Sequence, residues 1–573
     1  MNIYNSAKKI LGFFVVAAMA AGGSAVFTGC DDFLDEPVVG NPLDENSYDT
    51  KYKLQSVLNS AYDKLACETM QDSDWRFGEA TADNMVGNDE GLTSHMGQLV
   101  NFRFNTSNSY ILSRWTVYYQ AIHRVNQVIA NIHKCRVLDT ETDTYREIRY
   151  IYGQAKFLRA YFYFNLVRTF GGVPIRPEVE NVSNTVIPRS SLEECYAYIE
   201  KDLREAAIML PSRFTLTQCG KASAGAATAL LMKVLMYQAK PGDGSDKWKQ
   251  CAELGDYFVK GEPFTFAQML RFDERYKDTD WETLREELWF KPVAALKPDE
   301  SPETLEEQCP YLKSAYSLKF LDAYMNAITY DEQWYEVGEF CQGSVFEIVY
   351  KESGDGTSGD TNEGNSVFLS LFPLNNFNPP LKTNNILVDR VFGTDVRTNF
   401  IMGHNEQNPD GHNNLIGMGN RLPLKWYTPI KDRPVYTNDN AKNRRVIRFM
   451  EVVLTYAEAL NEVGRMQEAL EQLNSVQTQV NSINNGSKLS VAGGYGYLRN
   501  EIWLEREKEL AFEWDRFFDI VRQGRAASMM RAFSEVVNNH RGQFFREGVN
   551  EIFPIPQTEI DVSNGVVEQN PGY

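Results

Sequence analysis

Two apolar stripes run along the segment from Ile151 to Phe170, and they constrain the fold of this chain more than any other feature. Both stripes recur at three- and four-residue spacing, which predicts an α-helix that is buried on two faces. The helix should end at Gly171–Pro174, because glycine permits positive φ and proline lacks a backbone donor. The stripes consist of Ile151, Ala155, Leu158, Phe162 and Leu166, and of Phe157, Tyr161 and Phe164. The sequence therefore predicts a fold of packed helices.

Further helices are predicted in pairs. Ser191 and Glu194 have the spacing of a capping box at the start of an apolar stripe that ends at Pro211. A partner helix follows at 222–239, and 446–463 with 465–483 forms another pair, divided at Gly464. Pairs of about 35 to 45 residues are typical of tetratricopeptide-type units, which stack into a solenoid.

The first thirty residues have the pattern of an export signal. Lys8 and Lys9 precede an apolar run of 12 residues, Ile10–Ala21, which is shorter than the roughly 20 residues that span a bilayer. Phe27-Thr-Gly-Cys30 then resembles the lipobox of bacterial lipoproteins, with Phe27 where Leu is usual. We therefore expect cleavage after residue 29, acylation of Cys30, and palmitate or similar chains that anchor the protein to the outer membrane. A buried N-terminal helix is the competing interpretation.

Composition excludes several functions. The 58 Lys and Arg against 77 Asp and Glu give a formal charge of −19, and loss of Lys8 and Lys9 with the signal would make it −21. Such a surface repels phosphate backbones, so we expect no nucleic-acid partner. Seven cysteines follow Cys30 at wide spacings without C-x-x-C, which argues against a zinc site or a disulfide framework. We interpret them as mostly packed helix residues.

Catalytic motifs are missing from the sequence. It contains no G-x-S-x-G, H-E-x-x-H or Walker loop, and His404 and His412 are poorly spaced for a metal. Two carboxylates of a glycoside hydrolase can come from anywhere in a chain, so spacing leaves that alternative open. The charges within 499–522 fit helix-stabilising pairs at i,i+4 better than acid–base chemistry. We expect no catalytic residues, no cofactor and no metal.

The texture of the chain changes between 241 and 445, where Pro, Gly, Asn and Asp clusters multiply and helical runs shorten. We therefore divide the chain into a signal peptide (1–29), an N-terminal helical part (30–240), a loop-rich part (241–445) that faces the ligand, and a C-terminal helical part with its tail (446–573).

Four ordered segments resemble the SusD/RagB family of outer-membrane nutrient-binding lipoproteins. They are Gly153–Tyr161 with Phe170–Pro174, Tyr456–Ala459, Glu505–Gly524, and the close of the chain at Phe553–Glu559 and Gln569–Tyr573. The resemblance implies a mostly α fold, with a scaffold of about four tetratricopeptide-like helix pairs and loop-rich insertions that carry short strands. It also implies capture of an oligosaccharide at the cell surface and its transfer to a SusC-like, TonB-dependent transporter, without catalysis. Binding of peptides or another nutrient, a glycoside hydrolase, and a pure interaction scaffold remain alternatives.

Ligand residues are predicted from the way sugars bind. Their C–H faces stack on aromatic rings and their hydroxyls bond to Asn, Asp and Arg. Trp115, Trp503 and Trp514 lie in predicted scaffold helices, so we assign them to the core. The predicted ligand-binding residues are Trp75, Trp334 and Tyr335 as platforms, with Asp83, Asn84 and Arg390 as hydroxyl partners.

Overall fold

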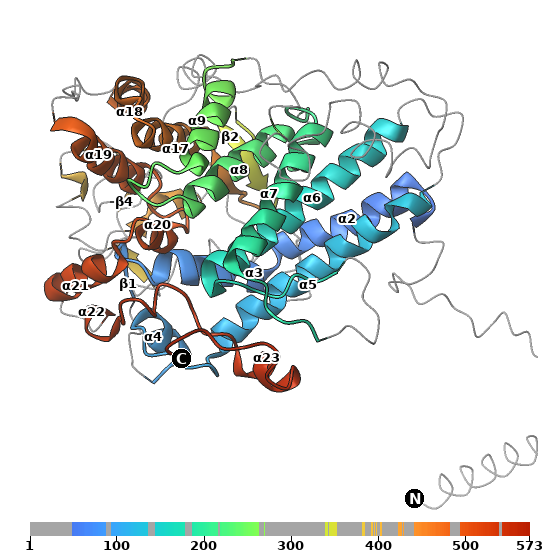
Figure 1. Cartoon of the computed structure of the whole chain (residues 1–573), viewed down its shortest axis with the longest axis horizontal. Helices are drawn as coiled ribbons and strands as arrows, with labels where there is room; N and C mark the ends of the chain where they lie inside the picture. Colours follow the sequence, from blue (N-terminus) through green and yellow to red (C-terminus); the bar gives the residue numbers. More distant parts are fainter. Residues whose placement is uncertain are drawn as a thin grey trace, which may run out of the picture. The chain divides into compact units, whose positions relative to one another are not determined.

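Helices that lie side by side in chain order form the frame of the protein (Figure 1). The computed structural model describes residues 48–87, 93–135, 144–177, 186–215, 218–262, 269, 339–341, 343–351, 381–383, 391–393, 395, 397, 402–403, 422–426, 428, 440–481, 493–537 and 541–573. The predicted signal peptide, Cys30, Trp334, Tyr335 and Arg390 lie outside these residues. Within them, no helix is both long and apolar enough to cross a membrane.

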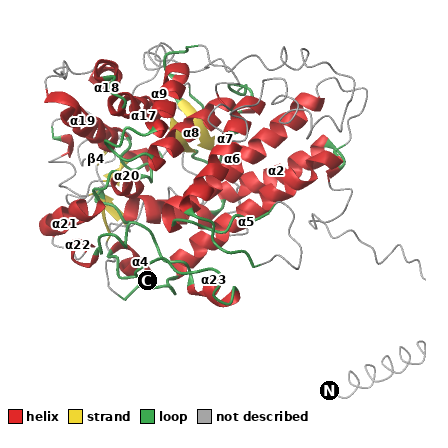
Figure 2. Ribbon diagram, viewed as in Figure 1, coloured by secondary structure: helices red, strands yellow, loops and turns green. Residues whose placement is uncertain are grey.

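The bounds of the helical elements are as follows. They are α2 (Lys51–Ala66), α3 (Glu68–Trp75), the π-helix η3 (Arg76–Ala80), α4 (His95–Val100), α5 (Ser109–Asn131), η4 (Ile132–Lys134), α6 (Thr144–Phe170), α7 (Leu192–Met209), α8 (Ala224–Gln238), α9 (Asp246–Phe258), η11 (Leu424–Trp426), α17 (Phe449–Glu462), α18 (Met466–Asn481), α19 (Gly494–Glu509), α20 (Arg516–Arg522), α21 (Ala526–Val537), α22 (Arg541–Phe544) and α23 (Gln557–Val562). Helix dominates the described structure, as Figure 2 shows.

The predicted tetratricopeptide-like scaffold is confirmed. Four helix pairs pack in sequence, namely α2 with α5, α6 with α7, α8 with α9, and α17 with α18. Neighbouring pairs also touch, because α5 packs on α6, α7 on α8, and α9 on α17. The boundary predicted at residue 240 thus falls between two packed helices, and residues Tyr48–Tyr573 form one compact unit.

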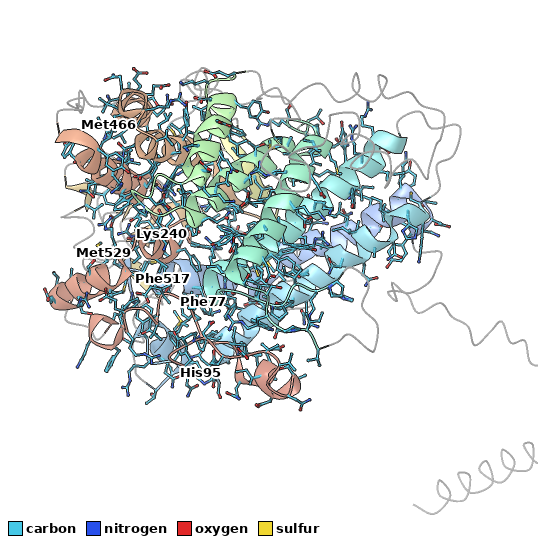
Figure 3. The ribbon with its side chains drawn as sticks, in the orientation of Figure 1. Phe77, His95, Lys240, Met466, Phe517 and Met529 are labelled. Carbon is cyan, nitrogen blue, oxygen red and sulfur yellow. The ribbon has the colours of Figure 1, made fainter. Side chains whose placement is uncertain are left out.

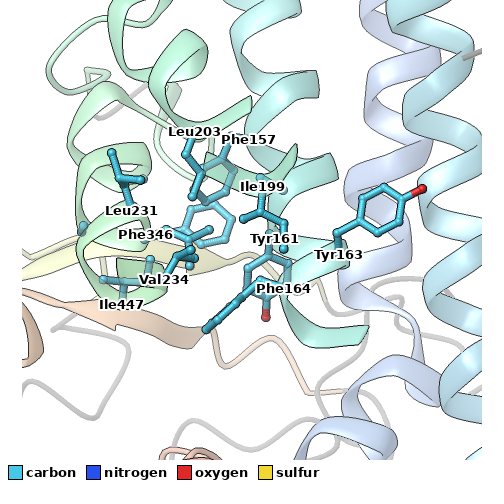
Figure 4. Packing of buried hydrophobic residues seen from close by; sticks show 14 of the residues in the cluster. Phe157, Tyr161, Tyr163, Phe164, Ile199, Leu203, Leu231, Val234, Phe346 and Ile447 are labelled. Atoms are coloured by element: carbon cyan, nitrogen blue, oxygen red, sulfur yellow. The ribbon is translucent and has the colours of Figure 1, made fainter. Parts of the chain in front are cut away.

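Helix α6 is buried on both faces, as its two stripes predict. The side chains of both stripes are at most 4% exposed. The rings of Phe157 and Phe346 meet edge-on with their centroids 4.9 Å apart, and Ile199 and Leu231 close the same cluster from α7 and α8 (Figure 4). Burying large apolar side chains in this way stabilises each by about 1.5–3 kcal/mol. The centre of the scaffold is therefore where α6, α7 and α8 meet.

Both predicted helix boundaries around the 171–191 connection are confirmed. Gly171 has a φ of 75°, in the left-handed region that glycine adopts most easily, and it ends α6. Ser191 caps α7 through the complete capping box, since its Oγ accepts from the Glu194 N–H at 3.1 Å and the Glu194 carboxylate accepts from the Ser191 N–H at 2.8 Å. These local signals fix where the chain leaves one helix and enters the next.

Short strands accompany the insertions. In the described parts of the chain there are three two-stranded antiparallel sheets. They pair β1 (Met85–Gly87) with β3 (Leu381–Thr383), β2 (Ser344–Ile348) with β6 (Arg444–Arg448), and β4 (Met402–Gly403) with β5 (Leu422–Pro423). The helix predicted from 446 in fact begins at Phe449, because 444–448 pair with β2 through a ladder that contains register shifts.

A tight turn interrupts the segment 499–522, whose charges are assigned from the sequence to pairs along a helix. Helix α19 ends at Glu509 and α20 begins at Arg516, and Phe512 and Trp514 between them have φ of 65° and 69°. Glu79 holds this turn, because its carboxylate accepts from the N–H groups of Phe512 at 3.3 Å and Trp514 at 3.2 Å. Gly78 lies so close that an added Cβ would stand 1.7 Å from the Trp514 carbonyl oxygen. The main chain at Gly78 packs directly against the main chain at Trp514, and only glycine fits there.

The charges of α19 and α20 mostly bind other elements, which corrects the prediction of i,i+4 pairs. Glu509 is fully buried and accepts from Arg397 at 3.1 Å and from Arg448 at 2.9 Å. Arg516 binds the Asp83 carboxylate through two nitrogens, at 2.8 and 2.9 Å. Among the described residues, the one ion pair between two side chains of α20 joins Arg522 to Asp519, at i,i+3. These side chains tie distant segments together.

The described cysteines agree with the packing interpretation for the most part. Cys67, Cys135, Cys195 and Cys251 are buried, and Cys219 and Cys341 are partly exposed. Cys309 lies outside the described residues.

Changing Gly78→Ala should destabilise the protein strongly. The new methyl group would collide with the main chain of the 510–515 turn, and such overpacking costs about 1–3 kcal/mol or more. Gly496→Ala is the matched control, since its added Cβ meets nothing within 4 Å on helix α19, and alanine favours the helix by up to about 1 kcal/mol. Urea unfolding monitored by circular dichroism measures both changes. Equal midpoints for the two variants would contradict the close approach.

Changing Asp202→Asn should destabilise the α6–α7 pair in a pH-dependent way. Asp202 accepts from Lys156 at 3.0 Å and from Arg159 at 2.6 Å. Burial alone would raise its pKa, but these two cations lower the pKa to about 2. Removing one partner of such a buried cluster costs about 3–5 kcal/mol at neutral pH.

The sign of the pH effect follows from the lowered pKa. The carboxylate stabilises the fold above its unfolded pKa of about 3.9 and loses this contribution as the pH falls towards about 2. The gap between wild type and Asp202→Asn should therefore shrink by about 1 kcal/mol between pH 5 and pH 3 in urea titrations. Asp246→Asn, on an exposed pair with Lys249, serves as the control and should leave the unfolding curve nearly unchanged. A gap that does not vary with pH would refute this role.

Candidate ligand-binding cleft

An open cleft of about 690 Å³ lies along helix α5, between the end of α2 and the C-terminal helix α23. Two other cavities in the described structure measure only about 20 and 40 Å³. The cleft is within the size range of small-ligand sites. Its lining residues are Lys64, Trp115, Thr116, Tyr119, Gln120, His123, Arg124, Arg176 and Glu559.

Helix α5 supplies one wall because it is amphipathic. Its apolar side, which includes Tyr118 and Ile122, is buried, whereas Thr116, Gln120 and His123 are exposed one turn apart along the opposite side. These three side chains offer a hydroxyl, an amide and an imidazole to the cleft. The wall thus carries the donors and acceptors that bind a hydroxylated ligand.

Two aromatic rings form the apolar part of the cleft. Trp115 and Tyr119, one turn apart on α5, have centroids 4.9 Å apart at 46°. Phe170 meets Trp115 edge-on at 5.2 Å and keeps it 3% exposed, whereas Tyr119 is partly exposed. The Tyr119 hydroxyl donates to the Pro174 carbonyl at 2.8 Å, and burial raises the pKa of this phenol well above its ordinary value. The ring of Tyr119 is therefore held in place, and of the two rings it is the one that is accessible to a ligand.

Arg176 reaches the cleft from a main chain that is fixed on both sides. Its N–H donates to the Tyr163 hydroxyl at 2.8 Å, and the Asn126 amide donates to the carbonyl of Pro177 at 3.2 Å. Asn126 in turn accepts from Arg159 at 3.1 Å, within the buried cluster around Asp202. The Arg176 guanidinium lies 5.9 Å from the centroid of the Tyr119 ring. Buried hydrogen bonds therefore preset the position of this cation.

The C-terminal tail builds the remaining wall, which carries Glu559. The Phe553 N–H donates to the Thr169 carbonyl at 2.8 Å, and the Gln557 N–H donates to the Thr106 carbonyl at 2.9 Å. Asn570 donates to the carbonyls of Phe170 at 2.9 Å and Phe553 at 2.7 Å. Phe77 and Phe517, both labelled in Figure 3, contact the Phe553 ring at 4.7 and 5.8 Å. The tail is thus a fixed part of the scaffold.

Charged groups of both signs line the cleft. Three cations, Lys64, Arg124 and Arg176, face it with one carboxylate, Glu559. In the part of the chain that the structure describes, no group of three or more His, Cys, Asp or Glu side chains is arranged to hold a metal.

Three of the predicted ligand residues lie elsewhere and are buried. Trp75 is 4% exposed, donates to Asp72 at 3.0 Å, and has the Arg76 guanidinium over its ring. Asp83 binds Arg516, and Asn84, which is fully buried, donates to Glu79 at 2.7 Å. Their hydrogen bonds run to Asp72, Glu79 and Arg516, because the stretch that contains them forms helix as far as Ala80 and then a turn that packs against the start of α20.

The cleft residues escaped sequence reasoning for identifiable reasons. Trp115 was assigned to the core, and its 3% exposure agrees with that, but it is also the neighbour of the one exposed ring. Thr116, Gln120 and His123 share one face of a helix, a signal that the helical period contains. Arg176 and Glu559 are separated by 383 positions, and nothing in their local sequence shows that they meet.

Comparisons with known proteins agree with this architecture. A family model described as "Starch-binding associating with outer membrane" matches residues 32–236, and the model "SusD family" matches residues 382–573. SusD-like protein P2 of Formosa agariphila is 25% identical over 95% of this chain and 97% of its own length. SusD-like protein P25 of the same organism is 20% identical over 95% of this chain and 96% of its own.

Solved structures share the fold. A laminarin-binding SusD-like protein has a TM-score of 0.67 at 24% identity, and covers 92% of this chain and 100% of its own. A SusD homologue from Bacteroides thetaiotaomicron has a TM-score of 0.69 at 19% identity, over 92% of this chain and 98% of its own. Surface glycan-binding protein A from that organism, in complex with laminarihexaose, has a TM-score of 0.63 at 18% identity, over 91% and 99%. With two family models on its two halves and relatives along its whole length, this chain belongs to the SusD/RagB family.

Proposed function

We propose that the protein is a cell-surface glycan-binding lipoprotein that captures oligosaccharides and passes them to a SusC-like TonB-dependent transporter of the outer membrane. The observation that carries the proposal is full-length similarity to SusD-like proteins, combined with a preformed cleft that offers binding groups. Similar folds include proteins whose names record binding of laminarin or laminarihexaose. The hydroxyl, amide and imidazole groups that line the cleft are suited to binding a hydroxylated ligand.

The helical scaffold suits the transporter contact. Its consecutive packed helices offer a rigid surface, which loses little entropy when a partner binds. The loop-rich part from 241 to 445 is proposed to face the ligand, with Trp334, Tyr335 and Arg390 as further contacts. The α5 cleft adds a second place at which a saccharide binds.

Glycan capture is tested at Tyr119. Tyr119→Ala should weaken binding of the preferred oligosaccharide at least fivefold, about 1 kcal/mol, because it removes the exposed ring of the cleft. Tyr52→Ala is the matched control, since Tyr52 is 70% exposed on α2 and does not line the cleft. Isothermal titration against a glycan panel measures both variants.

The same panel separates the alternatives. A parallel panel of peptides tests the rival nutrient class, and binding to peptides alone would refute glycan capture. New reducing ends after prolonged incubation with a bound glycan would instead reveal a glycoside hydrolase. Equal losses in Tyr119→Ala and Tyr52→Ala would remove the α5 cleft from the binding site.

Membrane attachment is tested at Cys30. Cys30→Ala should give a folded protein that no longer partitions with the membrane fraction, because it lacks the anchor of two or three acyl chains. Each buried methylene of such a chain contributes about 0.8 kcal/mol of membrane affinity. Cell fractionation followed by immunoblotting measures the partition, and Cys67→Ala, at a buried cysteine of the scaffold, is the control. A Cys30→Ala protein that stays membrane-bound and surface-exposed would contradict the lipid anchor.

A further inference from the structure

The cleft along α5 carries charge of the sign opposite to the rest of the chain. The whole chain has 58 Lys and Arg against 77 Asp and Glu, whereas the described residues that line the cleft include three cations and one carboxylate. The cations come from three separate segments: Lys64 from α2, Arg124 from α5, and Arg176 from the connection after α6. Their convergence on one cavity is a property of the fold.

We propose that the cleft selects an acidic saccharide, one that carries carboxylate or sulfate groups; this inference rests on the proposed function. Guanidinium groups bind both kinds of anion through paired N–H donors. A guanidinium has five such donors, so Arg124 can hold the Ser60 carbonyl and still donate to a ligand. The cations therefore need not be without protein partners to serve the ligand.

Arg176 is the residue that sets this preference. Its main chain is fixed through Tyr163 and Asn126, so the backbone that carries the guanidinium loses little further conformational entropy when a ligand binds. Its guanidinium lies beside the ring of Tyr119, the aromatic group that offers a face to a sugar. If a sugar ring stacks on Tyr119, its acidic substituent lies near Arg176. The hydroxyls of the sugar then lie near Gln120 and His123.

Glu559 brings a negative charge into the same cleft and opposes the effect of the cations. Its carboxylate lines the same cleft from α23 and repels a ligand carboxylate or sulfate. It also accepts hydrogen bonds from hydroxyl groups, which an acidic sugar still carries. The carboxylate repels every anion but also bonds to the hydroxyl groups of a sugar, so the cleft favours a hydroxylated anion over a simple inorganic one.

The experiment compares matched hexasaccharides that are neutral, uronic-acid based or sulfated, with sodium sulfate as the probe for simple ion binding. In isothermal titration, the acidic hexasaccharides should bind at least tenfold more tightly than the neutral one, about 1.4 kcal/mol. Raising the salt concentration should weaken the acidic ligands selectively, since mobile ions screen exposed charges.

Two variants with opposite effects test the residues. Arg176→Gln should lower affinity for the acidic hexasaccharides at least tenfold and change the neutral one by less than twofold. Glu559→Gln should raise affinity for the acidic hexasaccharides about threefold, so the proposal stays testable even if one variant folds poorly. Arg531→Gln, at a 54% exposed arginine paired with Glu547 on the surface, is the control and should change nothing.

The outcomes separate this inference from the proposed function. Neutral and acidic hexasaccharides that bind equally, with no effect of Arg176→Gln, would overturn the charge preference and leave glycan capture standing. Binding of sulfate as tight as that of the sulfated hexasaccharide would overturn saccharide selection and leave an adventitious ion only. Failure of every saccharide to bind would overturn both.

Discussion

Buried charges on α19 and α20 are the interaction on which the arrangement of distant segments depends. Glu509 lies between Arg397 and Arg448, and Arg516 lies between Asp83 and Glu507. A charge that is removed from water without a partner costs several kcal/mol, so each of these groups requires its counterpart to be in position. The pairs therefore disfavour arrangements of the chain in which a partner is displaced, whatever they add to stability. That requirement links the turn before β1, strand β6 and the segment around Arg397 to one pair of helices.

The same region explains how local strain is retained. Phe512 and Trp514 adopt positive φ, at a cost of order 1–3 kcal/mol each, between two helices that the charges already hold. Glu79 accepts from both of their N–H groups, and burial raises the pKa of this carboxyl to about 7 against the lowering effect of Asn84 and the two N–H groups. Trp514 also lies under the Arg444 guanidinium, 4.0 Å from its ring centroid. The turn is thus held by Glu79 of η3 and by Arg444 of β6, and it is also held between helices α19 and α20. Because Gly78 lies directly against this fixed turn, it has no room for a methyl group.

Sequence reasoning succeeded where a signal is local and failed where it is not. The two stripes of α6, the capping box at Ser191 and the stop at Gly171 each lie within one helix or its ends, and all were predicted. The ion pairs were misassigned because a helix shows only its own i,i+4 neighbours, whereas Arg516 pairs with Asp83 at 433 positions and Glu509 pairs with Arg448 and Arg397 at 61 and 112 positions. The partner of Asp83 is equally invisible in the sequence around it, although Asp83 was predicted to bind a ligand. The cleft needed the tail to fold back before Glu559 met α5, and no spacing records that.

An acidic protein can hold a site for an acidic ligand because electrostatic effects have a short range in salt. At physiological ionic strength the screening length is about 8 Å, so the excess of acids over the whole surface is felt weakly inside a cleft. In the site that we propose, an acidic ligand meets Arg176 and Arg124 directly, at a surface partly shielded from water, where each charge acts more strongly than in bulk. The overall negative charge of the protein would then mainly slow the encounter, whereas the three cations would govern how long the ligand stays. The proposed release of the ligand to a transporter is compatible with this division, because a few charged contacts at an open cleft hold a ligand without enclosing it.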